Sequence, residues 1–147
     1  MMFCISDDEP DTKATEVKRR PPVVAEIVDV TTSFSLSDDE MERTYARSRC
    51  LVATSTYEGY HMPAMEAYLR GIPIVVPREE PFPGIYGDAA GVHYFVRGSS
   101  GPASLPEAVR AAISAPPFSP DPGIAEWCSF RRVALLLRTT YESVLAR

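Results

Sequence analysis

The chain has 147 residues and a net charge of −5, with 20 acidic and 15 basic residues. This length predicts one domain with a hydrophobic core and excludes an enzyme of two full domains. The acidic balance excludes general attraction to nucleic acid or to an anionic membrane surface. Three widely spaced cysteines and the lack of any apolar run near the ~20 residues of a membrane span favour a soluble, cytoplasmic protein.

The first forty residues are predicted to contain a tail, a strand and the start of a helix. Residues 1–20 lack an apolar period and mix charges with Pro, Thr and Ser, so we expect a mobile tail. β-Branched residues dominate 23–30, which indicates a strand covered on both faces, as in a parallel sheet. Ser37 and Glu40 have the spacing of a capping box, which predicts a helix over 38–48.

The rest of the chain alternates short apolar runs with segments of helical period. Such alternation predicts an α/β fold: a partial Rossmann-like, open and mostly parallel sheet with helices on both faces. We expect a donor-binding part domain over 21–121 and a long carboxyl-terminal helix, within 122–147, that packs on it. The expected elements are a strand at 50–53, a loop at 54–62, a helix at 63–71, strands at 72–76 and 92–96, a helix opened by a Ser104–Glu107 capping box, and a helix carrying Trp127, Phe130, Ala134, Leu137, Tyr141 and Val144 on one face.

The loop at 54–62 is the strongest candidate for a binding site. It follows the carboxyl end of a predicted strand, where open α/β sheets bind their ligands. The helix that begins at Pro63 offers its amino-terminal amides to a phosphate or diphosphate. Glu58 on the loop and Glu66 in the helix supply acceptors for the paired hydroxyls of a sugar or ribose. The combination is typical of a nucleotide-sugar site.

The residues around these two glutamates resemble a known enzyme family. The run 58–67, EGYHMPAMEA, with 71–76, GIPIVV, resembles the glutamate-x7-glutamate region of the retaining nucleotide-sugar glycosyltransferases of the GT-B fold, glycosyltransferase family 4. Three further matches occur in that family's order, and the resemblance covers roughly residues 23–145. The further matches are 36–40 before Tyr45 and Ala46, 87–90 before a strand, and Trp127 with Tyr141 and Glu142.

The resemblance implies roles for individual residues. Glu58 would contact the donor sugar, Glu66 would hold the ribose, and four backbone amides would approach the sugar and diphosphate. The implied reaction is sugar transfer from a nucleotide-diphosphate donor with retention of configuration, without a cofactor or obligatory metal, and the chain has no Asp-x-Asp. The four amides belong to Gly59, Tyr60, His61 and Met62.

The chain also departs from that family. Many members have glycine where this chain has His61, so we expect His61 to contact the donor through its backbone. The acceptor domain and the basic diphosphate clamp normally precede this region, so we expect half of a GT-B carboxyl-terminal domain that is a poor catalyst alone. Its expected partners are a nucleotide sugar and either the missing upstream domain or another chain at an exposed sheet edge.

Other chemically capable residues favour structural roles. We expect Asp88 to be a turn acid, His93 to be a packed or edge residue, and Trp127 and Tyr141 to lie in the core. Arg78, just beyond a strand, is the one nearby basic residue that we consider for phosphate contact. Two alternatives to transfer remain open: a non-catalytic module that binds a nucleotide or a partner chain, and a sugar-nucleotide epimerase.

Overall fold

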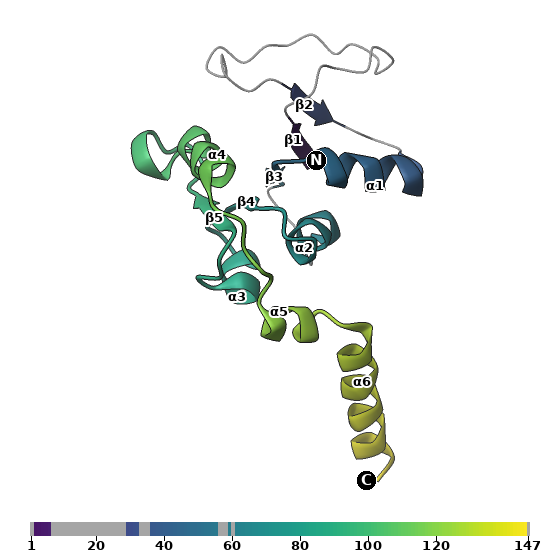
Figure 1. The fold of residues 1–147 in the computed structure, drawn as a ribbon. Coiled ribbons are helices and arrows are strands. Elements are labelled where there is room, and N and C mark those ends of the chain that lie inside the picture. Colours follow the sequence, from purple (N-terminus) through teal and green to yellow (C-terminus); the bar gives the residue numbers. More distant parts are fainter. Residues whose placement is uncertain (1, 7–28, 33–35, 56–58, 60, 147) are drawn as a thin grey trace.

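The computed structural model describes residues 2–6, 29–32, 36–55, 59 and 61–146. Its centre is a five-stranded sheet of order β2-β1-β3-β4-β5, with helices beside it and a separate helix projecting from the body (Figure 1). The elements in chain order are β1 (Met2–Ser6), β2 (Asp29–Thr32), α1 (Asp38–Arg47), β3 (Cys50–Ala53), α2 (Met62–Leu69), β4 (Ile74–Pro77), α3 (Phe82–Tyr86), β5 (Val92–Phe95), the short 3₁₀ helix η1 (Gly101–Ala103), α4 (Leu105–Ser114), α5 (Pro122–Trp127) and α6 (Phe130–Leu145).

Three strands form the parallel part of the sheet. β3 pairs with β4, and β4 with β5, both in parallel, with Leu51 opposite Ile74 and Ile74 opposite Val92. In the chain, α2 connects β3 to β4 and α3 connects β4 to β5. Neighbouring parallel strands need such crossover connections. This arrangement confirms the predicted α/β class, the open sheet and the long carboxyl-terminal helix.

Helices cover both faces of this sheet. Side chains alternate along a strand, so Leu51 and Ala53 point to one face while Cys50 and Val52 point to the other. The first face packs against buried residues of α1, α2 and α3, and the second against α4. The buried residues contributed by these helices are Tyr45, Ala64, Ala67, Tyr68, Phe82 and Tyr86 on the first face, and Ala108, Val109 and Ala112 on the second.

The amino-terminal end differs from the prediction. Met2–Ser6 forms β1, which pairs antiparallel with both β2 and β3, so a tail over 1–20 is wrong for these residues. Four apolar residues in a five-residue strand are too few for a visible period, and their pairing is with distant strands. β1 also covers the edge of β3 that we expected to be exposed, and β2 and β5 are the outer strands. Most of the strand predicted at 23–30 lies outside the described residues; Asp29 and Val30 begin β2.

One of the two predicted capping boxes is formed. The Ser37 hydroxyl accepts from the Glu40 amide at 3.4 Å, while the Glu40 carboxylate accepts from the Ser37 amide at 2.9 Å. The Ser37 hydroxyl also donates to Glu40 Oε2 at 2.7 Å, and this bond, together with the bond from the Ser37 amide, lowers the pKa of Glu40. The second prediction is wrong, because the Ser104 side chain makes no cap hydrogen bond and Glu107 pairs with Arg110 instead.

Two short helices and the last long helix also differ from expectation. α3 lies in the predicted loop at 77–91, and α5 precedes α6 where one continuous helix was expected. Ile124 of α5 packs against the core, but α6 has no buried residue, so its expected packing on the domain is wrong. Trp127 and Tyr141 are 42% and 64% exposed rather than in the core. Across the described residues, no helix combines the length and apolar character needed to cross a membrane.

Candidate functional site

The candidate site lies where the carboxyl ends of β3, β4 and β5 meet. In parallel strands these ends share one edge of the sheet, so the segments that follow them converge there. Thr54 and Ser55 follow β3, Glu79 follows β4, and Arg97 follows β5. The loop from β3 leads directly into α2, which begins at Met62.

His61 caps the amino terminus of α2 in an unusual backbone conformation. Its φ of 23° lies in the left-handed region that favours glycine. The side chain is buried, and its Nδ1 accepts a hydrogen bond from the Ala64 amide at 3.2 Å. Its ring also packs near Phe82, with 5.9 Å between ring centroids.

Because of the His61 cap, fewer backbone amides of α2 can bind a phosphate or diphosphate than we predicted. Pro63 has no N–H group, and the amides of Ala64 and Met65 donate to the His61 carbonyl at 3.0 and 3.3 Å. The first turn of α2 therefore offers fewer free donors than the sequence alone predicted.

Glu66 is held by a residue from a different helix. The buried Tyr45 of α1 donates its hydroxyl hydrogen to Glu66 Oε2 at 3.0 Å. Glu66 itself is partly buried, and the other carboxylate oxygen has no recorded partner among the described residues. A carboxylate fixed on one side and open on the other is suited to accept hydroxyl donors. The sequence comparison matched Tyr45 by position but assigned it no role.

Arg97 joins the three segments at this edge. Its guanidinium donates to the carbonyl of Thr54 at 2.9 Å, to the carbonyl of Ser55, and from Nε to Glu79 at 3.2 Å. A guanidinium suits this task because its donors form a rigid planar fork. Sequence reasoning missed Arg97, although its position directly after the strand predicted at 92–96, at the same edge as the loop, could have indicated it.

A hollow of about 300 Å³ adjoins Arg97 and the start of the loop. It places the Arg97 side chain beside open space next to the carboxyl ends of β3 and β5. The lining residues are Thr54, Phe95, Val96, Arg97, Gly98, Ser99, Leu105 and Pro106.

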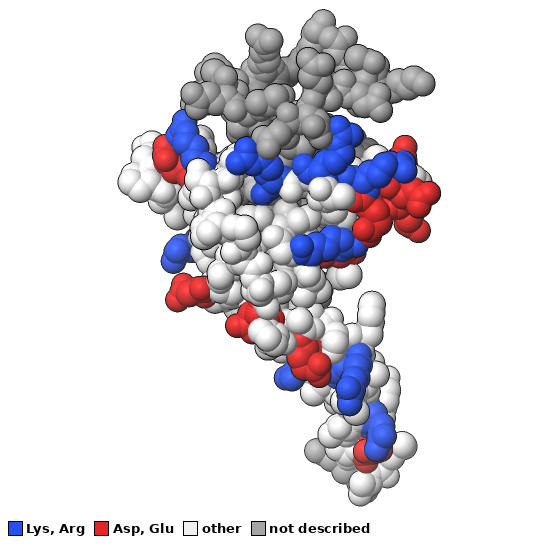
Figure 2. Space-filling model, in the orientation of Figure 1, with Lys and Arg blue, Asp and Glu red and all other residues white. Residues whose placement is uncertain are grey.

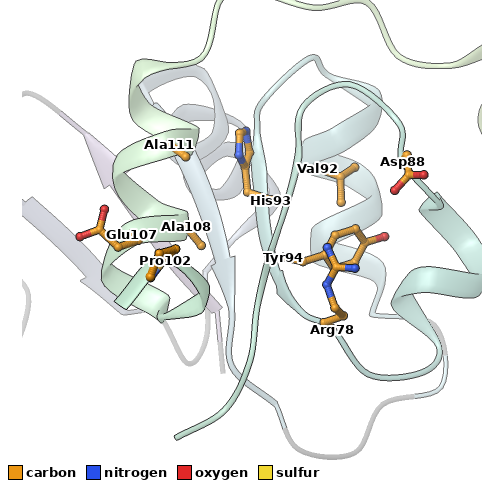
Figure 3. A pocket seen from close by; sticks show the side chains of 9 residues that line it. All are labelled: Arg78, Asp88, Val92, His93, Tyr94, Pro102, Glu107, Ala108 and Ala111. Atoms are coloured by element: carbon orange, nitrogen blue, oxygen red, sulfur yellow. The ribbon is translucent and has the colours of Figure 1, made fainter. Parts of the chain in front are cut away.

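A second hollow, of about 310 Å³, lies along β5. Its lining includes Asp88 and His93, for which we expected structural roles, and Arg78, which we considered for phosphate contact. Arg78 lies over the Tyr94 ring, 5.0 Å from its centroid, and Figure 3 shows this pair apart from His93, which faces Ala108 and Ala111. Burial lowers the pKa of His93 and raises the pKa of Tyr94 to about 12. Arg78 is thus engaged here rather than beside the loop, and neither hollow includes His61, Met62 or Glu66.

The structure locates four of the six residues predicted for the donor site. Gly59 is exposed on the loop, His61 and Met62 begin α2, and Glu66 lies one turn further on. Glu58 and Tyr60 lie outside the described residues. Within the described part of the chain, no group of three or more His, Cys, Asp or Glu residues is placed to hold a metal ion.

Comparison with known proteins gives one partial similarity. Over 58 residues, 40% of this chain, the sequence is 40% identical to an MMP alpha-(1->4)-mannosyltransferase of Mycolicibacterium hassiacum. This segment spans 14% of the mannosyltransferase's length. No protein-family model and no solved structure matches the chain. The sheet and its helices define an α/β fold, and the comparison shows that a part of the chain is similar to a glycosyltransferase.

Proposed function

We propose that this chain binds the nucleotide-diphosphate sugar donor of a glycosyl transfer reaction, at the loop between β3 and α2. The observation that carries the proposal is the Glu66 carboxylate, held by the buried Tyr45 hydroxyl at 3.0 Å beside the carboxyl edge of a parallel sheet. The partial similarity to a mannosyltransferase supports the same reaction class. The finer assignment, to a retaining reaction of glycosyltransferase family 4, rests on the ordered motifs in the sequence.

Each part of the site has a distinct task in this proposal. Glu66 accepts hydrogen bonds from the ribose hydroxyls, and Glu58 contacts the donor sugar. The amides of Gly59, Tyr60, His61 and Met62 approach the sugar and diphosphate. The charge that develops on the departing nucleoside diphosphate is stabilised by these donors and the α2 dipole, without a required metal.

Transfer itself requires more than donor binding in this proposal. The similar segment spans 14% of the mannosyltransferase, and an acceptor must be held against the donor for the reaction to proceed. We therefore assign the donor-binding part of the reaction to this chain and expect little or no transfer by it alone. Efficient transfer by the purified chain would contradict this part of the proposal.

Calorimetric titration tests the assignment of Glu66. GDP, UDP and ADP are each titrated into the chain and into Glu66→Ala, with Glu107→Ala as a control acid on α4, away from the loop. Loss of a charge-assisted hydrogen bond weakens binding by about 10- to 100-fold. We expect this loss in Glu66→Ala and unchanged affinity in Glu107→Ala.

Pyrophosphate separates ribose recognition from diphosphate recognition. Because pyrophosphate has no ribose, its affinity should be the same for the chain and for Glu66→Ala. Equal weakening for pyrophosphate and nucleotides would mean that the substitution damages the whole site. An absence of nucleotide binding, together with a stable complex with another polypeptide, would favour the non-catalytic module instead.

A further inference from the structure

The start of the loop between β3 and α2 is held by Arg97. Two nitrogens of its guanidinium group donate hydrogen bonds, one to the carbonyl of Thr54 at 2.9 Å and one to the carbonyl of Ser55. Both carbonyls belong to residues that directly follow β3. At the other end of the loop, His61 caps α2 through its bond with the Ala64 amide. Contacts within the protein therefore hold both ends of the loop that we assign to the sugar donor.

The guanidinium group of Arg97 is itself fixed by its surroundings. Its Nε donates to Glu79 Oε2 at 3.2 Å, on the segment that follows β4. Its central carbon lies 5.8 Å from the centroid of the buried Phe95 ring, within the range of a cation–π contact. The backbone before Arg97 is also held, because the Val96 amide donates to the Ala103 carbonyl at 2.8 Å. Arg97 thus links the loop to a base that the sheet fixes.

The surroundings of Arg97 oppose direct contact with a phosphate. All three nitrogens of its guanidinium group already donate within the protein. The Glu79 carboxylate beside them would also repel an incoming anion. A rigid planar fork that serves two backbone carbonyls and a carboxylate is suited to hold segments of the chain in a fixed arrangement.

We propose that Arg97 is a positioning residue of the donor site: it holds Thr54 and Ser55, and with them the start of the loop that binds the diphosphate and the sugar. This inference rests on the proposed function of that loop. Without the Arg97 hydrogen bonds the start of the loop gains conformational freedom, so part of the binding free energy must order it. The bond from Tyr45 to Glu66 does not involve Arg97, so recognition of the ribose by Glu66 should be unaffected.

Calorimetric titration of Arg97→Met with pyrophosphate, GDP, UDP and ADP tests this role. Pyrophosphate and the nucleotides should all bind more weakly by the same factor, about 5- to 30-fold. Glu66→Ala should instead weaken the nucleotides alone. Arg110→Ala is the matched control and should bind as the unmodified chain does, because Arg110 forms a surface ion pair with Glu107 within α4. Figure 2 shows basic and acidic side chains next to one another at this helix.

Circular dichroism of Arg97→Met separates positioning from loss of folded protein. Partial unfolding raises the apparent dissociation constant only by the reciprocal of the folded fraction. In a variant that is mostly folded, unfolding therefore cannot account for a weakening of about 5-fold or more. A weakening fully explained by the unfolded fraction would mean that Arg97 stabilises the fold without positioning the loop.

Added guanidinium provides a rescue experiment in Arg97→Ala. The hollow of about 300 Å³ that is lined by Thr54 and Arg97 gives a guanidinium ion access to the vacated position. At a low, non-denaturing concentration, guanidinium chloride should restore several-fold of the lost affinity for pyrophosphate. Tetramethylammonium chloride, which has no N–H donor, should not. The unmodified chain, titrated in the same salts, corrects for their own interaction with the ligand.

Arg97→Lys distinguishes positioning from simple charge attraction. Lysine keeps the positive charge but cannot reproduce the planar fork, so binding should remain several-fold weaker than in the unmodified chain. Full affinity in Arg97→Lys would assign Arg97 to charge attraction and overturn the inference. Unchanged affinities in Arg97→Met would also overturn it while the proposed function stands. If the unmodified chain bound none of the nucleotides, the proposed function itself would be contradicted, and the role of Arg97 with it.

Discussion

At the scale of single residues, the candidate site depends on three side chains, two of which join segments that are distant in the chain. His61 closes the first turn of α2, Tyr45 of α1 holds Glu66, and Arg97 holds the carbonyls of the loop after β3. Glu66 was predicted as a ligand-binding residue from its place in a motif. Tyr45 and Arg97 had no assigned role because their contacts join positions 21 and 43 residues apart, which no local pattern reveals.

Substitution of His61 separates the side-chain cap from the backbone strain. His61→Ala loses the bond to the Ala64 amide and keeps the positive φ that His61 already has, so the free energy of unfolding should fall by about 0.5–2 kcal/mol. His61→Gly loses the same bond but adopts this φ freely, so its loss should be a few tenths of a kcal/mol. Urea unfolding of both variants measures the difference, and equal losses would contradict the strain argument.

His93 should make the stability of the chain depend on pH. Burial lowers the pKa of His93, so the unfolded chain binds a proton more readily than the folded chain does. The stabilisation is present above the ordinary value of 6.5 and is lost as the pH falls below it, by at most about 1.4 kcal/mol per pH unit.

Urea unfolding at about pH 7.5 and about pH 5.5 measures this contribution. In His93→Leu the fall in stability between these two conditions should be smaller than in the unmodified chain. The two proteins differ only at position 93, so the difference between their falls in stability reports on His93. An identical fall in both proteins would mean that His93 is protonated as easily in the folded chain as in the unfolded one.

At the scale of elements, the starts of α1 and α4 show how far a Ser-x-x-Glu pattern predicts the hydrogen bonds that cap a helix. The Ser37–Glu40 pattern forms a capping box because the chain around it is extended at Ser37 and helical from Asp38. The same spacing at Ser104 does not form a capping box, since η1 precedes the helix and Glu107 forms an ion pair with Arg110. Pattern alone therefore identified the helix but not its terminal hydrogen bonds.

The two serines provide a matched test of this difference. Ser37→Ala removes a cap bond and should lower the free energy of unfolding by about 0.5–2 kcal/mol. Ser104→Ala removes no cap bond and should change it by less than about 0.5 kcal/mol. Thermal or urea unfolding compares the two, and a larger loss at Ser104 would contradict the described caps.

Arg97 should stabilise the carboxyl edge of the sheet. Arg97→Met leaves the carbonyls of Thr54 and Ser55 without their donor, so we expect a loss of about 1–3 kcal/mol. Arg110→Met is the control, because its exposed pair with Glu107 should contribute less than about 1 kcal/mol. If both substitutions cost the same, Arg97 does not hold the edge together.

At the scale of the whole molecule, the parallel core was predictable and its surroundings were not. β3 and β4 are continuous apolar runs, β5 is apolar apart from His93, and helical segments follow them, so their order defines an α/β sheet. β1 was missed because its pairing is set by distant strands, and α3 and α5, of five and six residues, are too short to show a period. The sequence correctly predicted that α6 is a helix with an apolar face, but such a face does not specify which surface packs against it.

The central claim is that a nucleoside diphosphate binds at the amino terminus of α2. Amide chemical shifts recorded by NMR during a titration with GDP, UDP or ADP test it most directly, because they report where binding occurs. We predict saturable shifts centred on Gly59, His61 and Met62, with Glu66 following and α6 unchanged. Shifts confined to the hollow beside β5, or no shifts with any of the three nucleotides, would contradict the claim.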